Sequence, residues 1–435
     1  MDRIWQRGRS AGQQPGWHGV GGQVTASVPG RAGDRPSPRS PATAVAVRGL
    51  FPIVIAGALI ATAHALAAQP AGGSALAFAL ILGGALGVVL QRSRFCFLCH
   101  TRDFVDRRDP RGLLAILLAL AVGTIGYHIV FGSWLPNPVP PRLPPDAHIG
   151  PVSWVLALGG LVFGLGMALS GSCVSAHLYR LAEGSPVVPF ALVGTAGGFV
   201  LGFTTWNTLY LQAVSAAPVV WLPHHLGYGG SLALQLAVLA GLAALLWTRR
   251  APSALSRSGA EPSLSEIVRS WFTGRWPYWV GGLGVGAIGF LVVLRLTPLG
   301  VTSAIGSGAR ALGTDAGVVP RRLEGLDGFA GCATVPGDTW MTPNGLLVIG
   351  LVAGAFAASF ASGQFAPRRP TLKDAARGLG GGLLLGWGAM TGLGCTVGTL
   401  LSGTMAAALS GWVFGAFVLF GTWGGLALAR RASAR

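Results

Sequence analysis

The chain alternates between long apolar runs and short polar connections. Each run holds about twenty mostly apolar residues, the length that an α-helix needs to cross the hydrocarbon core of a bilayer. We therefore predict an all-α polytopic membrane protein with nine or ten membrane-spanning helices. The runs lie at about residues 48–68, 74–91, 112–133, 152–170, 186–206, 230–248, 278–296, 345–362, 377–394 and 411–430.

Composition agrees with this pattern. Hydrophobic residues make up 51% of the 435 residues and charged residues only 10%, whereas about a quarter of a soluble domain is charged. The net charge of +17 could indicate nucleic-acid binding, but the arginines gather in the N-terminal tail and in short connecting loops. That distribution is typical of the cytoplasmic side of a membrane protein, so we predict no nucleic-acid partner.

The polar segments define the predicted domains. Residues 1–47 are rich in Gly, Pro, Ser and Arg, which predicts a disordered basic tail, and they contain no secretory signal. Residues 48–435 form a single transmembrane domain. Arginine-rich connections at alternate ends of the ten runs place both termini in the cytoplasm.

One sequence pattern occurs twice. Gly164-Leu-Gly-Met-Ala-Leu-Ser-Gly-Ser-Cys173 resembles Gly386-Trp-Gly-Ala-Met-Thr-Gly-Leu-Gly-Cys395. With the orientation above, the runs that carry the two copies cross the membrane in opposite directions. We therefore predict two inverted halves, 74–248 and 278–430, joined by a polar cytoplasmic linker at 249–277, with 48–68 as an additional first span.

Each copy ends in a turn of small residues followed by a short helix. Irregular backbone at membrane depth is tolerated only where protein or an aqueous cavity satisfies it. The start of a helix directs N–H groups and a positive dipole end at such a cavity, which favours an anion, and a thiol adds a soft, polarisable group. Close helix packing accounts for some of the glycines. The predicted binding residues on these re-entrant turns are Gly171, Ser172, Cys173, Gly394 and Cys395.

Three further cysteines have open interpretations. Cys96-Phe-Leu-Cys99-His100 matches a C-x-x-C-H haem-attachment pattern, and a redox dithiol or metal site is an alternative. The segment lies on the predicted cytoplasmic side, where covalent haem attachment is not expected. Cys332 lies in the polar segment between two spans, either at the entrance of a pathway or in a structural role. No hydrolase, metalloprotease or ATPase motif is present, so we predict no enzyme activity and no cofactor.

Several motifs together resemble the YeeE/YedE family of bacterial inner-membrane transporters of thiosulfate and related sulfur compounds. The resemblance covers about residues 74–430, while the first span, the 249–277 insertion, Cys99 and Cys332 have no clear counterpart in short members. The motifs are Arg94-Phe-Cys-Phe97 with Arg102-Asp103, Gly171-Ser-Cys173, Glu183-Gly184, Gly394-Cys395 and Gly411-Trp-Val-Phe-Gly415.

This resemblance implies two inverted halves whose loops dip to a narrow centre. There Cys96, Cys173 and Cys395 would pass the anion by thiol hydrogen bonds. It also implies a bacterial inner-membrane location and a small cytoplasmic sulfur-carrier protein as partner. Longer members have been linked to selenium metabolism. Three alternatives therefore stay open: a selenium-compound transporter of the same fold, a membrane redox or haem protein using Cys96, Cys99 and His100, and a membrane scaffold for a sulfur-carrier protein.

Overall fold

The computed structural model describes residues 41–433, except for residues 71, 140–141, 145, 252–270, 272, 297 and 330–340. The chain divides into two compact units, Met1–Ala44 and Val45–Arg435. The predictions for residues 1–40, for most of the linker at 249–277 and for Cys332 lie outside the described residues.

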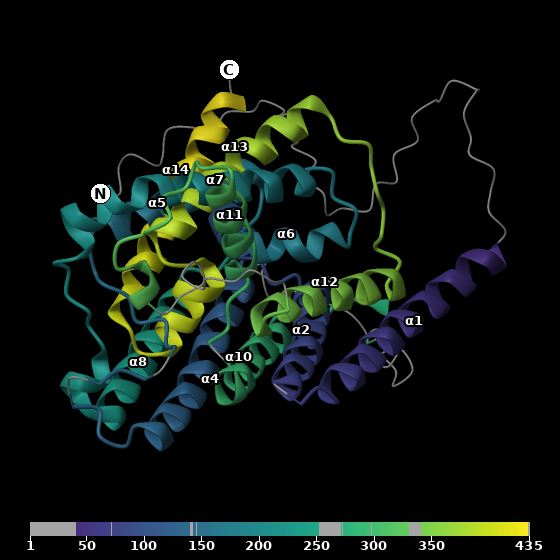
Figure 1. Ribbon diagram of the computed structural model, residues 1–435. Helices are drawn as coiled ribbons and strands as arrows, with labels where there is room; N and C mark the ends of the chain where they lie inside the picture. Colours follow the sequence, from purple (N-terminus) through teal and green to yellow (C-terminus); the bar gives the residue numbers. More distant parts are fainter. Residues whose placement is uncertain are drawn as a thin grey trace. The chain divides into compact units, whose positions relative to one another are not determined.

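Ten long helices make up most of the described chain (Figure 1). Ten helical segments of the described chain, each built on one of these helices and some continuing into the short helix that follows, are long and apolar enough to cross a membrane, which confirms the prediction of an all-α polytopic membrane protein. The long helices are α1 (Pro41–Ala67), α2 (Gly73–Ser93), α4 (Arg111–Trp134), α5 (Trp154–Ser170), α7 (Val188–Leu209), α8 (Leu222–Thr248), α10 (Tyr278–Arg295), α12 (Pro343–Ala361), α13 (Leu372–Thr391) and α14 (Leu409–Ser433).

Shorter helices lie between the long ones. Three matter for the site: α3 (Phe97–Arg107), α6 (Val174–Leu181) and the π-helix η4 (Thr396–Gly403), while α11 (Ser303–Asp315) lies in the chain between α10 and α12. Two very short turns, η1 (Tyr210–Val214) and η3 (Leu326–Gly328), complete the set. Between α2 and α4, and between α5 and α7, the chain therefore inserts a short helix into what would otherwise be a loop.

The start of α1 differs from the prediction. The helix begins at Pro41, so residues 41–47, which were assigned to the disordered tail, are helical. Proline is favoured in the first turn of a helix because its fixed φ suits the helix and its missing N–H has no partner there. The alanines and valines that follow extend the apolar run, so the boundary moves towards the N-terminus.

Backbone contact between glycine-bearing helices holds the bundle together. A Cβ on Gly83 of α2 would overlap the carbonyl of Leu347 in α12, and a Cβ on Gly350 would overlap the carbonyl of Leu80. Small residues at such positions let two helices approach until their backbones touch, which is how helices associate in lipid. The glycine-rich runs therefore specify close helix pairs.

The helix pairs follow a regular pattern. The most extensively packed pairs are α2 with α12, α4 with α10, α7 with α13, and α5 with α14, and α5 also packs on α13 as α2 does on α10. Exchanging α2 with α10, α4 with α12, α5 with α13 and α7 with α14 reproduces this set. The pairing thus has the form expected of two halves with equivalent helices.

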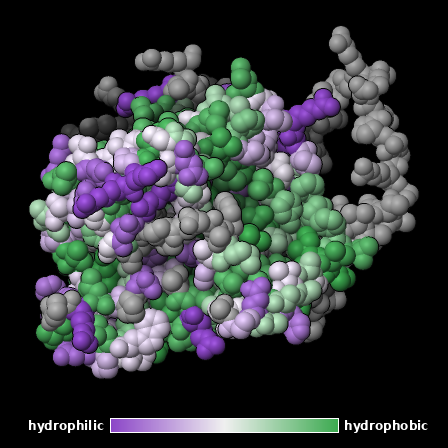
Figure 2. Space-filling view, in the orientation of Figure 1, coloured by the Kyte–Doolittle hydropathy of each residue, from purple (hydrophilic) through white to green (hydrophobic). Residues whose placement is uncertain are grey.

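Burial separates the centre of the bundle from its periphery. In an 18-residue apolar window of Leu372–Gly403, the segment that contains α13 and η4, 83% of residues are buried, against 11% in the corresponding window of Gly49–Ala67 of α1. Figure 2 shows broad apolar areas on the visible face between groups of hydrophilic residues. Exposed apolar side chains suit a lipid environment; on α1 they include Leu50, Ile53, Val54 and Ile60.

Candidate functional site

Three of the cysteines occupy equivalent positions in three short helices. Cys96 is the N-cap residue of α3, Cys173 that of α6 and Cys395 that of η4. In each case the cysteine carbonyl accepts a backbone hydrogen bond of 2.9–3.1 Å from the residue four positions later. The first N–H groups of a helix have no partner within it, so every one of these thiols stands beside potential anion donors.

The starts of these helices meet. The Cys96 thiol makes a side-chain hydrogen bond with the Cys173 thiol, and Cys173 also contacts the hydroxyl of Thr396, the residue after Cys395. Ser175 Oγ lies 3.3 Å from Cys173 Sγ. None of the three cysteines forms a disulfide within the described part of the chain, and none has any solvent exposure. The structure thus brings Cys96 and Cys173 into contact and places the first residue of η4 against them.

The first turn is held by side-chain hydrogen bonds. Gly171 has φ 90°, a left-handed conformation that favours glycine, and it ends α5. The ring nitrogen Nε2 of His177 lies 3.1 Å from Ser170 Oγ, which links the start of α6 to the end of α5. Ser172 is fully buried, and its hydroxyl has no partner among the described residues. That hydroxyl is available to a ligand.

The second turn is held by a different set of backbone and side-chain hydrogen bonds. Leu393 has φ 53° and Gly394 has φ 150°. The Gly394 N–H donates to the carbonyl of Ala389 over 2.7 Å, and Thr399 Oγ1 donates to the carbonyl of Gly392 over 3.0 Å. The chain therefore reverses within three residues and delivers Cys395 to the start of η4.

The helices that carry the two turns pack antiparallel to each other. A Cβ on Gly166 of α5 would lie 2.8 Å from the Gly381 carbonyl of α13, and a Cβ on Gly388 would lie 2.6 Å from the Gly159 carbonyl. Residue numbers increase along one helix as they decrease along the other. Close packing therefore explains several glycines of both copies, and the copies run in opposite directions.

Arg180 and Cys99 join the site without having been predicted as part of it. Arg180 Nη2 donates to Cys99 Sγ over 3.2 Å, and Nη1 donates to the Gly171 carbonyl over 3.1 Å. Cys99 also hydrogen-bonds to Cys96. Arg180 follows Cys173 by two helical turns, so the helical period could have predicted that both residues lie on one face of α6. For Thr396, the sequence indicated a role only through its position next to Cys395.

The C-x-x-C-H segment is packed against protein on several sides. The His100 ring is 2% exposed and makes edge-on contacts with the rings of Phe95 and Tyr278, at centroid distances of 6.1 and 5.1 Å. A Cβ on Gly112 would overlap the same ring. Within the described part of the chain, no group of three or more His, Cys, Asp or Glu residues is placed to hold a metal ion. This geometry does not favour the haem-attachment interpretation.

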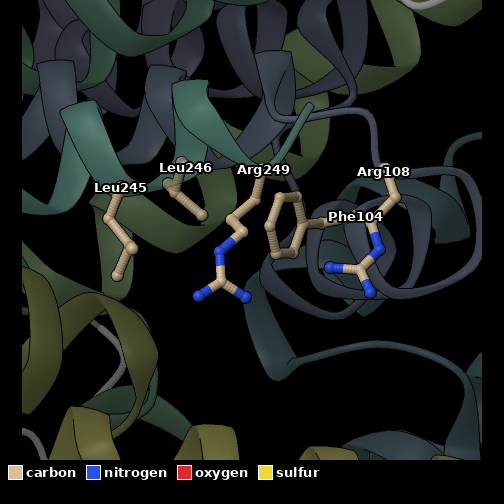
Figure 3. Close-up of a pocket in the computed structure, with 5 residues that line it drawn as sticks. All are labelled: Phe104, Arg108, Leu245, Leu246 and Arg249. Carbon is tan, nitrogen blue, oxygen red and sulfur yellow. The ribbon is translucent and has the colours of Figure 1, made fainter. Parts of the chain in front are cut away.

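A surface pocket lies away from the thiols, at the ends of α3 and α8. It has a volume of about 210 Å³ and is lined by Phe104, Arg108, Leu245, Leu246 and Arg249 (Figure 3). Arginines beside an apolar wall are typical of the membrane–water interface. None of the predicted binding residues lines this pocket.

A much narrower cavity lies beside the second turn. Its volume is about 10 Å³, about the space of one water molecule, and its lining includes His148, Leu393 and Thr399. Burial lowers the pKa of His148 to about 4, so this side chain is neutral at physiological pH. The three thiols are unexposed, and the cavity beside the second turn is too small to hold an anion.

The described geometry can be compared with known proteins. Residues 92–424 match the family described as sulphur transport. The chain is 28% identical to the thiosulfate transporter TsuA of Spirochaeta thermophila over 360 residues, which covers 79% of this chain and 96% of that protein. It is 27% identical to the thiosulfate transporter TsuA of Escherichia coli K12 over 372 residues, covering 79% and 92%. It is 29% identical to the probable transporter YedE of Escherichia coli K12 over 181 residues, covering 40% and 42%.

Proposed function

The chain belongs to the sulphur transport family, and on this premise we propose that it carries thiosulfate across the membrane past Cys96, Cys173 and Cys395. The observation that carries the proposal is the meeting of three cysteine-capped helix starts at one buried place. Two relatives that cover most of the chain are named thiosulfate transporters, which supports this substrate.

The chemistry of the site suits thiosulfate. This divalent anion has a soft sulfur end and an oxygen end that accepts strong hydrogen bonds. Helix N-terminal N–H groups favour the oxygens, and neutral S–H groups donate weak hydrogen bonds to the sulfur. A thiolate would repel the anion, so the neutral thiol is the working form. Stepwise exchange between adjacent S–H groups needs no covalent intermediate.

We further propose that the transporter consists of two inverted halves with re-entrant turns. Two observations support this: the helix pairs keep their pattern when equivalent helices are exchanged, and α5 and α13 run antiparallel. An inverted pair of turns would approach the centre from opposite faces and share one midplane site. Access to this site would then open on one face of the membrane at a time.

The arginine distribution supports cytoplasmic termini in a bacterial inner membrane. Arg92 to Arg111, Arg249 and Arg250, and Arg430 and Arg431 lie at ends that would share one side. Alkaline phosphatase fused after Arg431 should be inactive, whereas a fusion in the loop at 207–229 should be active. The resemblance noted above supports a small cytoplasmic sulfur-carrier protein as receiver, which copurification from a thiosulfate-grown host would test.

The function is tested by uptake of ³⁵S-labelled thiosulfate into cells that lack their own importers. Wild-type protein should restore uptake, and Cys173→Ala should reduce it by about tenfold or more, because a buried site that loses its donor is left with an unmet hydrogen bond. Thr422→Val, a buried change on α14, serves as the control and should transport normally.

Two results would count against the proposal. Full uptake by Cys173→Ala would remove the thiol pathway while leaving thiosulfate as substrate. Absence of thiosulfate uptake by wild-type protein that is correctly inserted would overturn the substrate, and parallel assays with selenite and sulfite would identify the replacement.

A further inference from the structure

Arg180 is a partly buried cation that forms no salt bridge within the described part of the chain. Its guanidinium donates to one backbone carbonyl and to the Cys99 sulfur. Among the described residues no carboxylate lies within salt-bridge distance of it, and the nearby Glu183 accepts instead from Gln91 Nε2 at 3.4 Å. Buried charges in proteins are normally paired, so this guanidinium lacks the partner that its position calls for.

Cys99 connects this cation to the proposed site. It hydrogen-bonds to Cys96, which in turn contacts Cys173. Cys99 is partly buried, whereas Cys96 and Cys173 have no exposure. The thiols therefore form a connected series that ends, at its more exposed member, against a guanidinium.

Polar side chains lie together at the ends of α2 and α12. Gln91, which is fully buried, donates to Gln364 Oε1 at 3.1 Å, and Arg94 Nη2 lies 3.5 Å from the same oxygen. The Arg94 Nε atom and the Gln91 Oε1 atom have no partner among the described residues. These polar side chains are linked through Gln91 to Glu183, which follows Arg180 by one helical turn.

We propose that Arg180 and Cys99 form a second binding station for the transported sulfur oxyanion, next to the Cys96–Cys173 pair. This inference rests on the proposed transport function. The guanidinium holds the oxygen end, since its planar fork of donors matches an oxyanion, and the Cys99 S–H donates to the sulfur end. In this structure the Cys99 sulfur accepts the hydrogen bond from Arg180 that the anion would accept when bound.

The first test compares uptake rates of four variants. Because a charge-assisted hydrogen bond is the stronger kind, Arg180→Gln should lower thiosulfate uptake by about tenfold or more, and Arg180→Lys by less. Cys99→Ala should lower it by about threefold while leaving the bond from Arg180 to Gly171 intact. The control Arg111→Gln removes an arginine that is paired with Asp109 at 2.6 Å and should change uptake by less than about twofold.

The second test measures the station without transport. Purified protein in detergent is labelled with a maleimide, and the modification of Cys99 is followed by peptide mass spectrometry. Thiosulfate should slow the labelling of Cys99 by about fivefold or more in wild-type protein, whereas potassium chloride of equal ionic strength should not. In Arg180→Gln the protection should be lost.

The outcomes separate the two proposals. If Arg180→Gln abolishes uptake while Cys99→Ala is silent and Cys99 is not protected, Arg180 only supports the Gly171 turn and the station is overturned. An equal loss in Arg111→Gln would also overturn it, because net charge alone would explain the effect. If wild-type protein takes up no thiosulfate, the transport proposal fails, and the labelling assay still decides the station.

Discussion

The two cysteine turns occupy the same place in the repeated sequence pattern, but the residues that follow them differ. Both follow a glycine-rich helix, contain a glycine with positive φ, and end on a cysteine that caps a short helix. The first turn leads into a regular α-helix that carries His177 and Arg180, whereas the second leads into a π-helix, Thr396–Gly403, with no charged residue. Both turns therefore provide a thiol and helix N-terminal N–H groups, whereas only the helix after the first turn provides a charged side chain.

In the proposed function, this difference would give the transport pathway a direction. Near the second turn, the buried histidine is neutral and the adjacent cavity is small. Beside the first turn, the Arg180 guanidinium contacts the thiol series. In the proposed function, an anion that leaves the thiols on this side would meet that positive charge. In the proposed orientation this side is cytoplasmic, which would suit import.

The largest expected effect comes from the glycines that shape the turns. Gly394→Ala should place a Cβ 2.5 Å from Thr399 Oγ1 at a position with φ 150°, whereas a Cβ on Gly171 (φ 90°) has no atom within 4 Å. Strain at such positions costs about 1–3 kcal/mol. Both variants should lower the thermal unfolding temperature in detergent, Gly394→Ala by more. Equal stability of Gly394→Ala and wild type would show that the second turn can relax.

A smaller effect is expected from the hydroxyl that joins the second half to the first. Thr396→Val keeps the shape of the side chain but removes the contact with Cys173. Loss of this weak polar contact, at the low end of the roughly 0.5–1.5 kcal/mol that a hydrogen bond contributes, should lower thiosulfate uptake about threefold. Uptake at the wild-type rate, with normal expression, would mean that Cys173 acts independently of η4.

Ser175→Ala tests the corresponding contact within the first half. Ser175 Oγ lies 3.3 Å from Cys173 Sγ, a long contact to a weakly hydrogen-bonding atom. We expect uptake to fall by about twofold or less. In one assay, the uptake rate should therefore be lowest for Thr396→Val, intermediate for Ser175→Ala and highest for wild type. The reverse order would place the more important partner of Cys173 on its own helix.

The smallest effect is expected from pH. Because burial lowers the pKa of His148 to about 4, the folded protein binds its proton more weakly than the unfolded chain does. The stabilisation due to neutral His148 is therefore present above about pH 6.5 and is lost as the pH falls towards 4. Uptake should not change through titration of His148 between pH 7 and 8. A pH-dependent step in that interval that disappears in His148→Asn would contradict this.

The sequence by itself determined the membrane class, the ten spans, the family and the positions of the turns. The spans follow from the length of apolar run that a bilayer requires, since each of the ten runs falls on one long helix. The turns follow from Ser170-Gly-Ser-Cys173 and Gly392-Leu-Gly-Cys395, where small residues permit backbone that other residues disfavour. These are local properties, so they can be found without knowing what packs against them. The role of Cys332 and the disordered tail stay predictions.

Only the tertiary structure decided which side chains meet. The Cys96–Cys173 contact, the hydroxyl of Thr396 at Cys173 and the bond from Arg180 to Cys99 join residues of different helices. The faces that bring these helices together are rich in glycine, and such faces allow many helix pairings equally well. The choice among pairings comes from the packing of the whole bundle, which is why the sequence indicated the thiols but not the arginine that completes their surroundings.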